Sequence, residues 1–426
     1  MNRTFRTFSL GCKVNSYECS ALSSTLLSRG YKEDKENPDV IIINTCSVTS
    51  TADQKSRQHI RSIMKDYPNA ICVVMGCYAQ GNYEFISNEI KPHILVGTSN
   101  RHLIPDLIEQ YYQNGKNIVK VDINPRLYKY EELGVTSFSE NIRSYLKIQD
   151  GCDNFCSYCL IPYRRGKARS RKKENVIEEA KYLISKGYKE IVLTGIHVGG
   201  YGKDLSDCSF SDLVESLSKL DNLYRLRISS IEESEIDDKL IELVINNPIL
   251  AKHLHIPLQS GSETVLKRMN RKYSVNDFYQ KIHYIHELNP DLALTSDVIV
   301  GFPGESEEEF QETIDFIKKC GFNMLHVFPF SAREGTLAYK MKDQIDPRIK
   351  KERARTLIEL SKKLWEEYTD RFIGKEVDVL LENYEPNENM GTGHTSNYIH
   401  VLIKGCIAKP GDIIRVKLEK SMILTE

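Results

Sequence analysis

The first part of the chain alternates short apolar runs with longer segments in which apolar residues recur at helical spacing. Helical spacing is found at residues 16–28 and 52–65. The apolar runs predict strands at Phe5–Leu10, Val40–Asn44, Ile71–Met75 and Ile94–Val96. Such alternation is typical of a parallel sheet with helices on both faces. We therefore predict an α/β domain with a doubly wound parallel sheet over residues 1–115.

The alternation resumes at Tyr145 and continues to about Ser331. Strands are predicted at Tyr145–Ile148, Glu190–Leu193, Tyr224–Ser229, His253–Pro257, Leu292–Val300 and Met324–Phe328. Six strand–helix units predict an incomplete (β/α)6 barrel, and we assign residues 142–370 to this domain. Residues 116–141 contain Pro125, Gly134 and several serines without clear periodicity, which predicts a linker.

After Asp346 the pattern predicts one long charged helix from Pro347 to about Phe372. Short alternating segments follow at Glu376–Glu382, Tyr398–Leu402 and Asp412–Lys417, with turns predicted at Gly391–Gly393 and Pro410–Gly411. This pattern favours a small antiparallel β-barrel over residues 371–426.

Composition places the chain among soluble globular proteins. It has 426 residues, of which 40% are hydrophobic and 27% charged, so a substantial core is available. The N-terminus lacks an apolar run of signal-peptide length, and no stretch is long enough to span a bilayer. We expect a cytoplasmic protein with no membrane partner. The net charge of −1 gives no global sign of a nucleic-acid partner, so such evidence must come from local clusters.

Three of the eleven cysteines form the pattern Cys152-x-x-x-Cys156-x-x-Cys159, directly after the first strand of the second domain. In a long cytoplasmic chain, metal binding or catalysis is a more common use of closely spaced cysteines than disulfide formation. Three thiolates suit a [4Fe–4S] cluster and leave one iron free to bind a substrate or cofactor. A structural zinc site would need a fourth ligand, and the neighbouring sequence offers none.

This loop resembles the cluster loop of radical S-adenosylmethionine enzymes, and the six strand–helix units of the domain resemble the superfamily's partial barrel. Tyr158, before the last cysteine, also fits, because that position is usually aromatic in the superfamily. The resemblance implies S-adenosyl-L-methionine as a cofactor, bound through the open iron and along the carboxyl ends of the barrel strands. It further implies contacts of the cofactor with Tyr158, Gly195, Glu232, Gln259, Gly301 and Phe330. Glycines and polar residues at strand ends are also ordinary turn residues.

Three further cysteines each follow a predicted strand of the first domain, namely Cys12, Cys46 and Cys77. The carboxyl ends of parallel strands share one edge of a sheet, so these cysteines are expected to converge there. Gly11 and Gly76 precede two of them and would allow the backbone to bend closely around a bulky group. A single free cysteine is more often a small buried residue. We interpret Cys19, Cys72, Cys208, Cys320 and Cys406 in that structural way.

The three parts together resemble the methylthiotransferase family over essentially the whole chain. The resemblance implies a second [4Fe–4S] cluster on Cys12, Cys46 and Cys77, and a C-terminal TRAM domain that binds tRNA. Within the family, GCKVNSYE around Cys12 and CDNFCSYCLIPYRRGKARSR resemble the branch that acts on N6-threonylcarbamoyladenosine at position 37. The branch that acts on isopentenyladenosine usually has GCQMN at the first of these segments.

Residues 163–173 contain seven basic residues, a strip that could bind RNA phosphates beside the cluster loop. A solvated charged face is the plain alternative. The C-terminal segment adds polar and aromatic residues suited to unpaired RNA, which could equally be packing residues. The RNA-binding candidates are Arg164, Arg165, Lys167, Arg169, Arg171, His394, Asn397 and Tyr398.

The resemblance implies radical transfer of a methylthio group to C2 of an adenosine in the tRNA anticodon loop. Its implied partners are an electron donor such as flavodoxin or ferredoxin, and a sulfur donor. Three alternatives stay open: a methylthiotransferase for isopentenyladenosine, one for a ribosomal protein, and an RNA-binding iron–sulfur protein without turnover.

Overall fold

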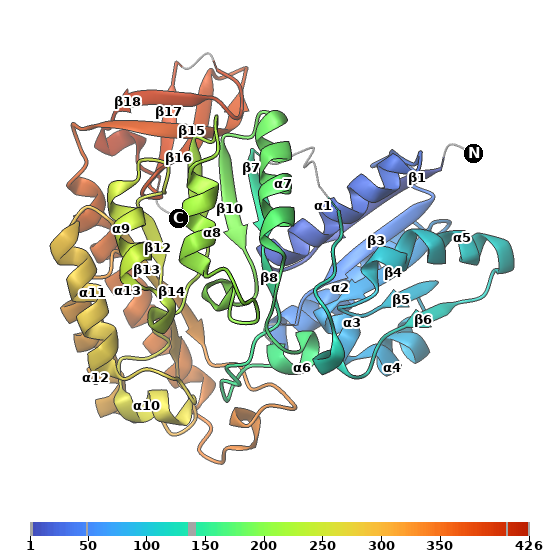
Figure 1. The fold of residues 1–426 in the computed structure, drawn as a ribbon. Helices are drawn as coiled ribbons and strands as arrows, with labels where there is room; N and C mark the ends of the chain where they lie inside the picture. Colours follow the sequence, from blue (N-terminus) through green and yellow to red (C-terminus); the bar gives the residue numbers. More distant parts are fainter. Residues whose placement is uncertain (1–2, 48–49, 135–141, 406–407, 425–426) are drawn as a thin grey trace.

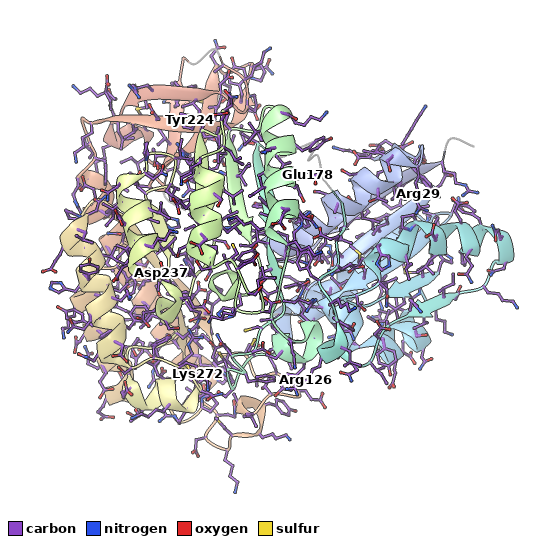
Figure 2. All side chains as sticks on the ribbon, viewed as in Figure 1. Arg29, Arg126, Glu178, Tyr224, Asp237 and Lys272 are labelled. Atoms are coloured by element: carbon purple, nitrogen blue, oxygen red, sulfur yellow. The ribbon has the colours of Figure 1, made fainter. Side chains whose placement is uncertain are left out.

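The computed structural model describes residues 3–47, 50–134, 142–405 and 408–424. An N-terminal α/β domain lies beside a larger central barrel, and a small antiparallel sheet covers one end of that barrel (Figure 1). Side chains fill both bodies and the boundary between the barrel and the small sheet, where Tyr224 donates a hydrogen bond to Asp378 over 2.9 Å (Figure 2). Among the described residues, no helix is both long and apolar enough to cross a membrane.

The N-terminal sheet is entirely parallel, with strand order β2-β1-β3-β4-β5-β6. Alternate residues of its central strands pack in two separate cores: Ile42 and Val73 in one, Ile41 and Val74 in the other. The sheet is therefore covered on both faces, which confirms the doubly wound prediction. Its strands are β1 (Thr4–Ser9), β2 (Lys32–Glu33), β3 (Val40–Thr45), β4 (Ile71–Gly76), β5 (Ile94–Val96) and β6 (Ile118–Lys120). Its main helices are α1 (Lys13–Ser28), α2 (Ser50–Asp66), α3 (Cys77–Gly81), α4 (Tyr83–Phe85) and α5 (Ile104–Asn114).

Two edge strands of this sheet were absent from the sequence prediction. Both β2 and β6 are short and mostly exposed, so they lack the apolar run that marks the central strands. β6 lies within the stretch assigned to the linker, so the sheet extends beyond residue 115. Residues 135–141 of that stretch lie outside the described residues.

Six parallel strands form the central barrel, in the order β7-β10-β11-β12-β13-β14. Isolated bridges from Leu226 to Leu250 and from Ser230 to His255 connect its two halves. The incomplete barrel is thus confirmed. Its strands are β7 (Arg143–Lys147), β10 (Glu190–Thr194), β11 (Arg225–Ile228), β12 (His253–His255), β13 (Ala293–Val300) and β14 (Met324–Pro329). The short antiparallel pair β8 (Gln149–Asp150) and β9 (Arg169–Ser170) flanks the cluster loop.

Three of the barrel helices begin at serine residues that cap them. Ser209, Ser274 and Ser306 each accept a hydrogen bond from the backbone three residues later, and the acidic residue there bonds back. These reciprocal bonds satisfy backbone N–H groups that a helix leaves unpaired at its start. The helices are α6 (Ile161–Arg165), α7 (Lys173–Ser185), α8 (Phe210–Ser218), α9 (Asp238–Asn246), α10 (Glu263–Arg268), α11 (Val275–Leu288) and α12 (Glu307–Cys320).

The long helix α13 (Pro347–Asp370) leads into a four-stranded antiparallel sheet of order β17-β16-β15-β18. The strands are β15 (Glu376–Glu385), β16 (Met390–Thr395), β17 (His400–Lys404) and β18 (Ile413–Lys417). The turn predicted at Gly391–Gly393 is wrong, because these residues lie inside β16. A Cβ on Gly393 would lie 2.0 Å from the Leu380 carbonyl oxygen, so glycine here permits close strand approach.

Candidate active site

A cavity of about 850 Å³ lies between the N-terminal sheet, the barrel strands and the C-terminal sheet. All three parts of the chain contribute to its walls. Ile161, two residues after the last cysteine of the cluster loop, also lies in the lining. Its lining includes Cys12, Lys13, Cys46, Cys77, Arg165, Gly195, Arg227, His253, His255, Asp297 and Tyr398. The cavity therefore holds the three cysteines of the N-terminal domain and reaches a residue that lies close in sequence to the cluster loop.

Cys12, Cys46 and Cys77 converge at one edge of the N-terminal sheet, as the strand pattern predicts. Cys46 and Cys77 directly follow β3 and β4, and Cys12 precedes α1. Gly11 has a φ of +98°, and a Cβ there would lie 2.5 Å from the Cys46 Sγ. Glycine is therefore required for the close approach of the first two cysteine segments.

Arg165 connects this cysteine group to a buried network of charges. Its Nε–H donates to the Cys77 Sγ over 3.1 Å, and its Nη1 lies 2.8 Å from Glu18 Oε1 and 3.0 Å from Asp150 Oδ1. Lys147 Nζ lies 3.0 Å from the same Glu18 oxygen and 2.6 Å from Asp150 Oδ2. Glu18 belongs to the N-terminal sheet domain and the other ionic residues to the barrel, so the network joins the two bodies.

Burial and charge act in opposite directions within this network. Burial alone would raise the pKa of Glu18, but Arg101, Arg165 and Lys147 hold that pKa well below its usual range. Burial also raises the pKa of the Cys77 thiol, and the nearby Arg165 cation opposes this shift. The guanidinium therefore favours the thiolate form, which is the form that binds metal.

The cluster loop is held by close backbone packing and by a side chain from the loop between α10 and α11. Gly151 has a φ of +73°, and a Cβ there would lie 1.9 Å from the Lys167 carbonyl oxygen. An Arg271 Nη1–H donates to the Cys156 Sγ over 3.4 Å. Arg271 also forms an ion pair with Glu232, one of the residues expected to contact the cofactor. Glu232 is therefore linked to the cluster loop through a single arginine.

The donor set of this loop fits a [4Fe–4S] cluster. Three partly exposed thiols are present, and a guanidinium donates toward one of them, as cluster sulfurs commonly accept N–H groups. Within the described parts of the chain, no group of three His, Cys, Asp or Glu side chains is arranged to hold a metal ion. The ligand geometry of a [4Fe–4S] cluster differs from that of a single metal ion. Each thiolate binds its own iron, so the thiolates lie further apart.

The other residues expected to contact the cofactor occupy three different environments. Gly195 lines the cavity, and a Cβ there would lie 3.1 Å from the Gln149 carbonyl oxygen. Gln259 has a φ of +66°, and its backbone bonds to Asp297 and Ile299 of β13. A Cβ on Gly301 would lie 2.2 Å from Lys350 Cγ, so this glycine is explained by packing within the chain.

Phe330 and Tyr158 belong to a small apolar cluster beside the loop. Phe330 is 5% exposed and meets Phe302 edge to face, with ring centroids 5.2 Å apart. Tyr158 packs against the same cluster. These aromatic side chains support the loop from behind, and their predicted contact with S-adenosylmethionine stays a prediction.

The basic strip differs from the expected solvent-facing surface. Arg165, Arg169 and Arg171 are buried and paired with carboxylates, so these side chains are not free to meet RNA phosphates. Their charges are neutralised by Glu18, Asp150 and Glu179, which are buried beside them. Lys167 is exposed and Arg164 half-buried, so only these two of the named strip residues keep the expected exposure.

The C-terminal candidates are also more deeply placed than an RNA surface would require. His394 is 8% exposed, with its Nδ1 2.7 Å from Glu382 Oε1. Asn397 donates to the Tyr368 hydroxyl over 2.8 Å and is 7% exposed. These two residues are packing residues in this structure, which corrects the expectation. Tyr398 instead lines the cavity, where its ring stacks on His253 with centroids 4.9 Å apart.

Several cavity residues were not singled out by the sequence analysis. Lys13 follows the first cysteine, and Arg227 and His253 lie on barrel strands. The position of Lys13 beside Cys12 was the one available signal, whereas buried polar residues within strands give none. Of the cysteines expected to be structural, Cys19, Cys72, Cys208 and Cys320 are buried, and Cys406 lies outside the described residues.

Comparisons with known proteins agree with this fold and site. Residues 146–317 match the radical SAM superfamily, and residues 4–97 match a family described as uncharacterized protein family UPF0004. Two solved structures share the fold. TsrM, a radical S-adenosylmethionine methyltransferase from Kitasatospora setae, has 13% identity and a TM-score of 0.59, covering 77% of this chain and 73% of TsrM. The cobalamin-dependent radical enzyme OxsB has 14% identity and a TM-score of 0.53, covering 87% of this chain and 56% of OxsB.

Curated relatives align over nearly the whole chain. The threonylcarbamoyladenosine tRNA methylthiotransferase MtaB of Bacillus subtilis is 45% identical, covering 97% of this chain and 93% of MtaB. MtaB of Aquifex aeolicus is 36% identical, with 96% and 98% covered. A tRNA-2-methylthio-N(6)-dimethylallyladenosine synthase of Bacillus subtilis is 34% identical, with 98% and 84% covered.

The fold and the cysteine loop thus define a radical S-adenosylmethionine enzyme, and this class implies that cofactor and one [4Fe–4S] cluster. Within the class, the chain belongs to the methylthiotransferase family.

Proposed function

We propose that this protein transfers a methylthio group to C2 of N6-threonylcarbamoyladenosine at position 37 in the anticodon loop of tRNA. The observation that carries the proposal is the single cavity shared by Cys12, Cys46, Cys77 and the carboxyl ends of the barrel strands. The MtaB relatives, with 36% to 45% identity, support this substrate over dimethylallyladenosine, for which the relative is 34% identical.

In this proposal, Cys152, Cys156 and Cys159 hold the first cluster and Cys12, Cys46 and Cys77 hold a second. With S-adenosylmethionine bound, the first cluster supplies the electron that starts radical chemistry. The protein's own residues orient the cysteines and shield the reacting carbon. Arg271 and Arg165 donate N–H groups to one cysteine of each set. The walls from three parts of the chain exclude water from the reacting carbon, which limits side reactions.

The proposal assigns a role to each segment. The N-terminal sheet, which extends to β6, would carry the second cluster, residues 142–370 the radical chemistry, and residues 371–426 the RNA contacts. An electron donor of the flavodoxin or ferredoxin class and a sulfur donor are required partners. A cytoplasmic location follows from the proposed tRNA substrate.

The test is mass spectrometry of tRNA nucleosides from cells with and without the gene. Loss of 2-methylthio-N6-threonylcarbamoyladenosine with accumulation of its precursor is the expected result. Loss of the methylthio form of isopentenyladenosine instead would assign the chain to the other tRNA branch. Unchanged tRNA would contradict the proposal and direct the assay to ribosomal proteins. Absence of 5′-deoxyadenosine release by the reconstituted protein would indicate RNA binding without turnover.

A further inference from the structure

Lys13 brings an unpaired positive charge into the cavity. It is the first residue of α1 and follows Cys12, and its side chain lines the cavity. Its side chain is exposed, and among residues 3–47, 50–134, 142–405 and 408–424 no hydrogen bond or ion pair holds it. Because α1 has 16 residues, its N-terminus adds positive potential at the same place. The ammonium group is therefore available to an anion that enters the cavity.

Arg227 supplies a second, independent observation. This residue is 2% exposed and lines the same cavity. Its Nε lies 2.7 Å from Glu190 Oε1, and its Nη2 donates to the Thr395 carbonyl over 3.2 Å. The Nη1 group is buried and has no hydrogen-bond partner within the described part of the chain. A buried guanidinium N–H without an acceptor is costly, so an anion bound beside it in the cavity would be stabilised.

The charges around these two residues do not balance. Arg143, Arg225 and Arg227 all surround Glu190, with nitrogen–oxygen distances of 3.5, 3.0 and 2.7 Å. Glu382 pairs with Arg143, and Asp378, which lies near Arg225, pairs with Arg415. With Lys13 included, this described group has five cations and three carboxylates. The region therefore carries a surplus of positive charge that its own carboxylates leave uncompensated.

We propose that Lys13 and Arg227 form a subsite for the carboxylate of the threonylcarbamoyl group, an inference that rests on the proposed function. C2 of the adenine must approach the group held by Cys12, and Lys13 is the next residue along the chain. The carboxylate is attached to N6 through a few bonds, and N6 is bonded to C6 of the six-membered ring that contains C2. A base placed for reaction would thus carry its carboxylate toward Lys13.

Two other carboxylate or phosphate groups share this chemistry, namely the RNA backbone and the methionyl carboxylate of S-adenosylmethionine. The test separates them with three anticodon stem-loop RNAs that differ only at position 37. One carries N6-threonylcarbamoyladenosine, one carries its uncharged carboxamide, and one carries unmodified adenosine. Binding of each fluorescently labelled RNA to the full-length protein is measured by anisotropy, without any need for turnover.

The wild-type protein is expected to bind the acid about 10-fold more tightly than the carboxamide, as for one charge-assisted hydrogen bond. Lys13→Gln should abolish this preference and leave carboxamide binding unchanged, whereas Lys13→Arg should retain it. Lys116→Gln is the matched control, because Lys116 is an exposed lysine of the N-terminal domain with no place in the cavity. Its binding of all three RNAs should equal that of the wild type.

Equal binding of acid and carboxamide by the wild type would overturn the subsite. A uniform loss for all three RNAs in Lys13→Gln would assign the lysine to a phosphate, and a loss of S-adenosylmethionine binding alone would assign it to that cofactor. Turnover of the acid-bearing RNA by the reconstituted wild type is scored separately. Failure of turnover with the binding preference intact would contradict the proposed function and not the subsite.

Discussion

Arg165 and Cys77 meet across the boundary between the N-terminal sheet and the barrel, where the Arg165 Nε–H donates to the Cys77 Sγ over 3.1 Å. The same guanidinium binds Glu18 from the first body and Asp150 from the second. One side chain thus holds the two bodies together and fixes the orientation of a proposed cluster ligand. Loosening this boundary would displace the cysteine group relative to the barrel.

We expect Arg165→Met to destabilise the protein by about 3–5 kcal/mol, because Glu18 and Asp150 would lose a buried partner. Urea unfolding of the apo-protein measures this change. Arg348→Met is the matched control, since Arg348 is a fully exposed residue of α13, and its unfolding curve should coincide with that of the wild type. If the urea-unfolding curve of Arg165→Met coincided with that of the wild type, the network would contribute little to the free energy of unfolding.

Stability should depend on acid pH through Glu190. Burial alone would raise its pKa, but Arg227, Arg143 and Arg225 lower that pKa from 4.5 to about 2. The stabilisation is therefore fully present above about pH 4.5 and is lost as pH falls toward 2, with a magnitude of about 3 kcal/mol. Glu190→Gln should be less stable at pH 7, and its difference from wild type should shrink below pH 4.5. Urea unfolding between pH 7 and about pH 3 checks this, and a constant difference would argue against it.

Removal of either cysteine group should have different consequences. Cys46→Ala is expected to lose about four irons per chain and all methylthio transfer, while release of 5′-deoxyadenosine continues. Cys156→Ala should lose both reactions. Iron analysis and product chromatography on anaerobically reconstituted protein measure these outcomes. Cys320→Ala, at a buried position outside the cavity, is the control. Methylthio product from Cys46→Ala would refute the second cluster assignment.

Asn397 should act on stability and not on RNA affinity. It donates to the Tyr368 hydroxyl over 2.8 Å within the contact between α13 and the C-terminal sheet. Asn397→Ala should cost about 1–3 kcal/mol, because the hydroxyl loses the hydrogen bond it accepts and keeps only the one it donates to the Asp291 carbonyl. Thermal unfolding measures the loss, and stem-loop binding well below the transition should match wild type. Weakened binding by a fully folded variant would restore Asn397 as an RNA contact.

The strands of the sheet and barrel were predictable because parallel strands buried on both faces form continuous apolar runs. Val40–Thr45 and Ile71–Gly76 are buried throughout, and their predicted ends agree within a residue. The strands Lys32–Glu33 and Ile118–Lys120 were not predicted, because exposed edge strands carry no such pattern. At Gly393 the same residue type that often marks a turn instead admits a neighbouring strand.

The convergence of Cys12, Cys46 and Cys77 followed from strand topology alone. The burial of the basic strip could not be predicted from the sequence. Charged residues are usually exposed, and the carboxylates that pair with these arginines lie far away in sequence. Glu18 and Arg165 are 147 residues apart, and only the folded chain shows that they neutralise one another. Likewise, Arg227 lies within an ordinary strand, where the sequence gives no sign of a vacant donor.

Tyr398 reaches the cavity from the C-terminal sheet with a φ of +72°, stacked on His253 of the barrel. The small sheet is therefore part of the cavity wall as well as a separate domain. Any exchange of this sheet between relatives would also replace part of the reaction chamber's wall. Chimaeras that carry a foreign C-terminal domain should lose catalytic efficiency even when they still bind RNA, unless residues facing Tyr398 are exchanged as well.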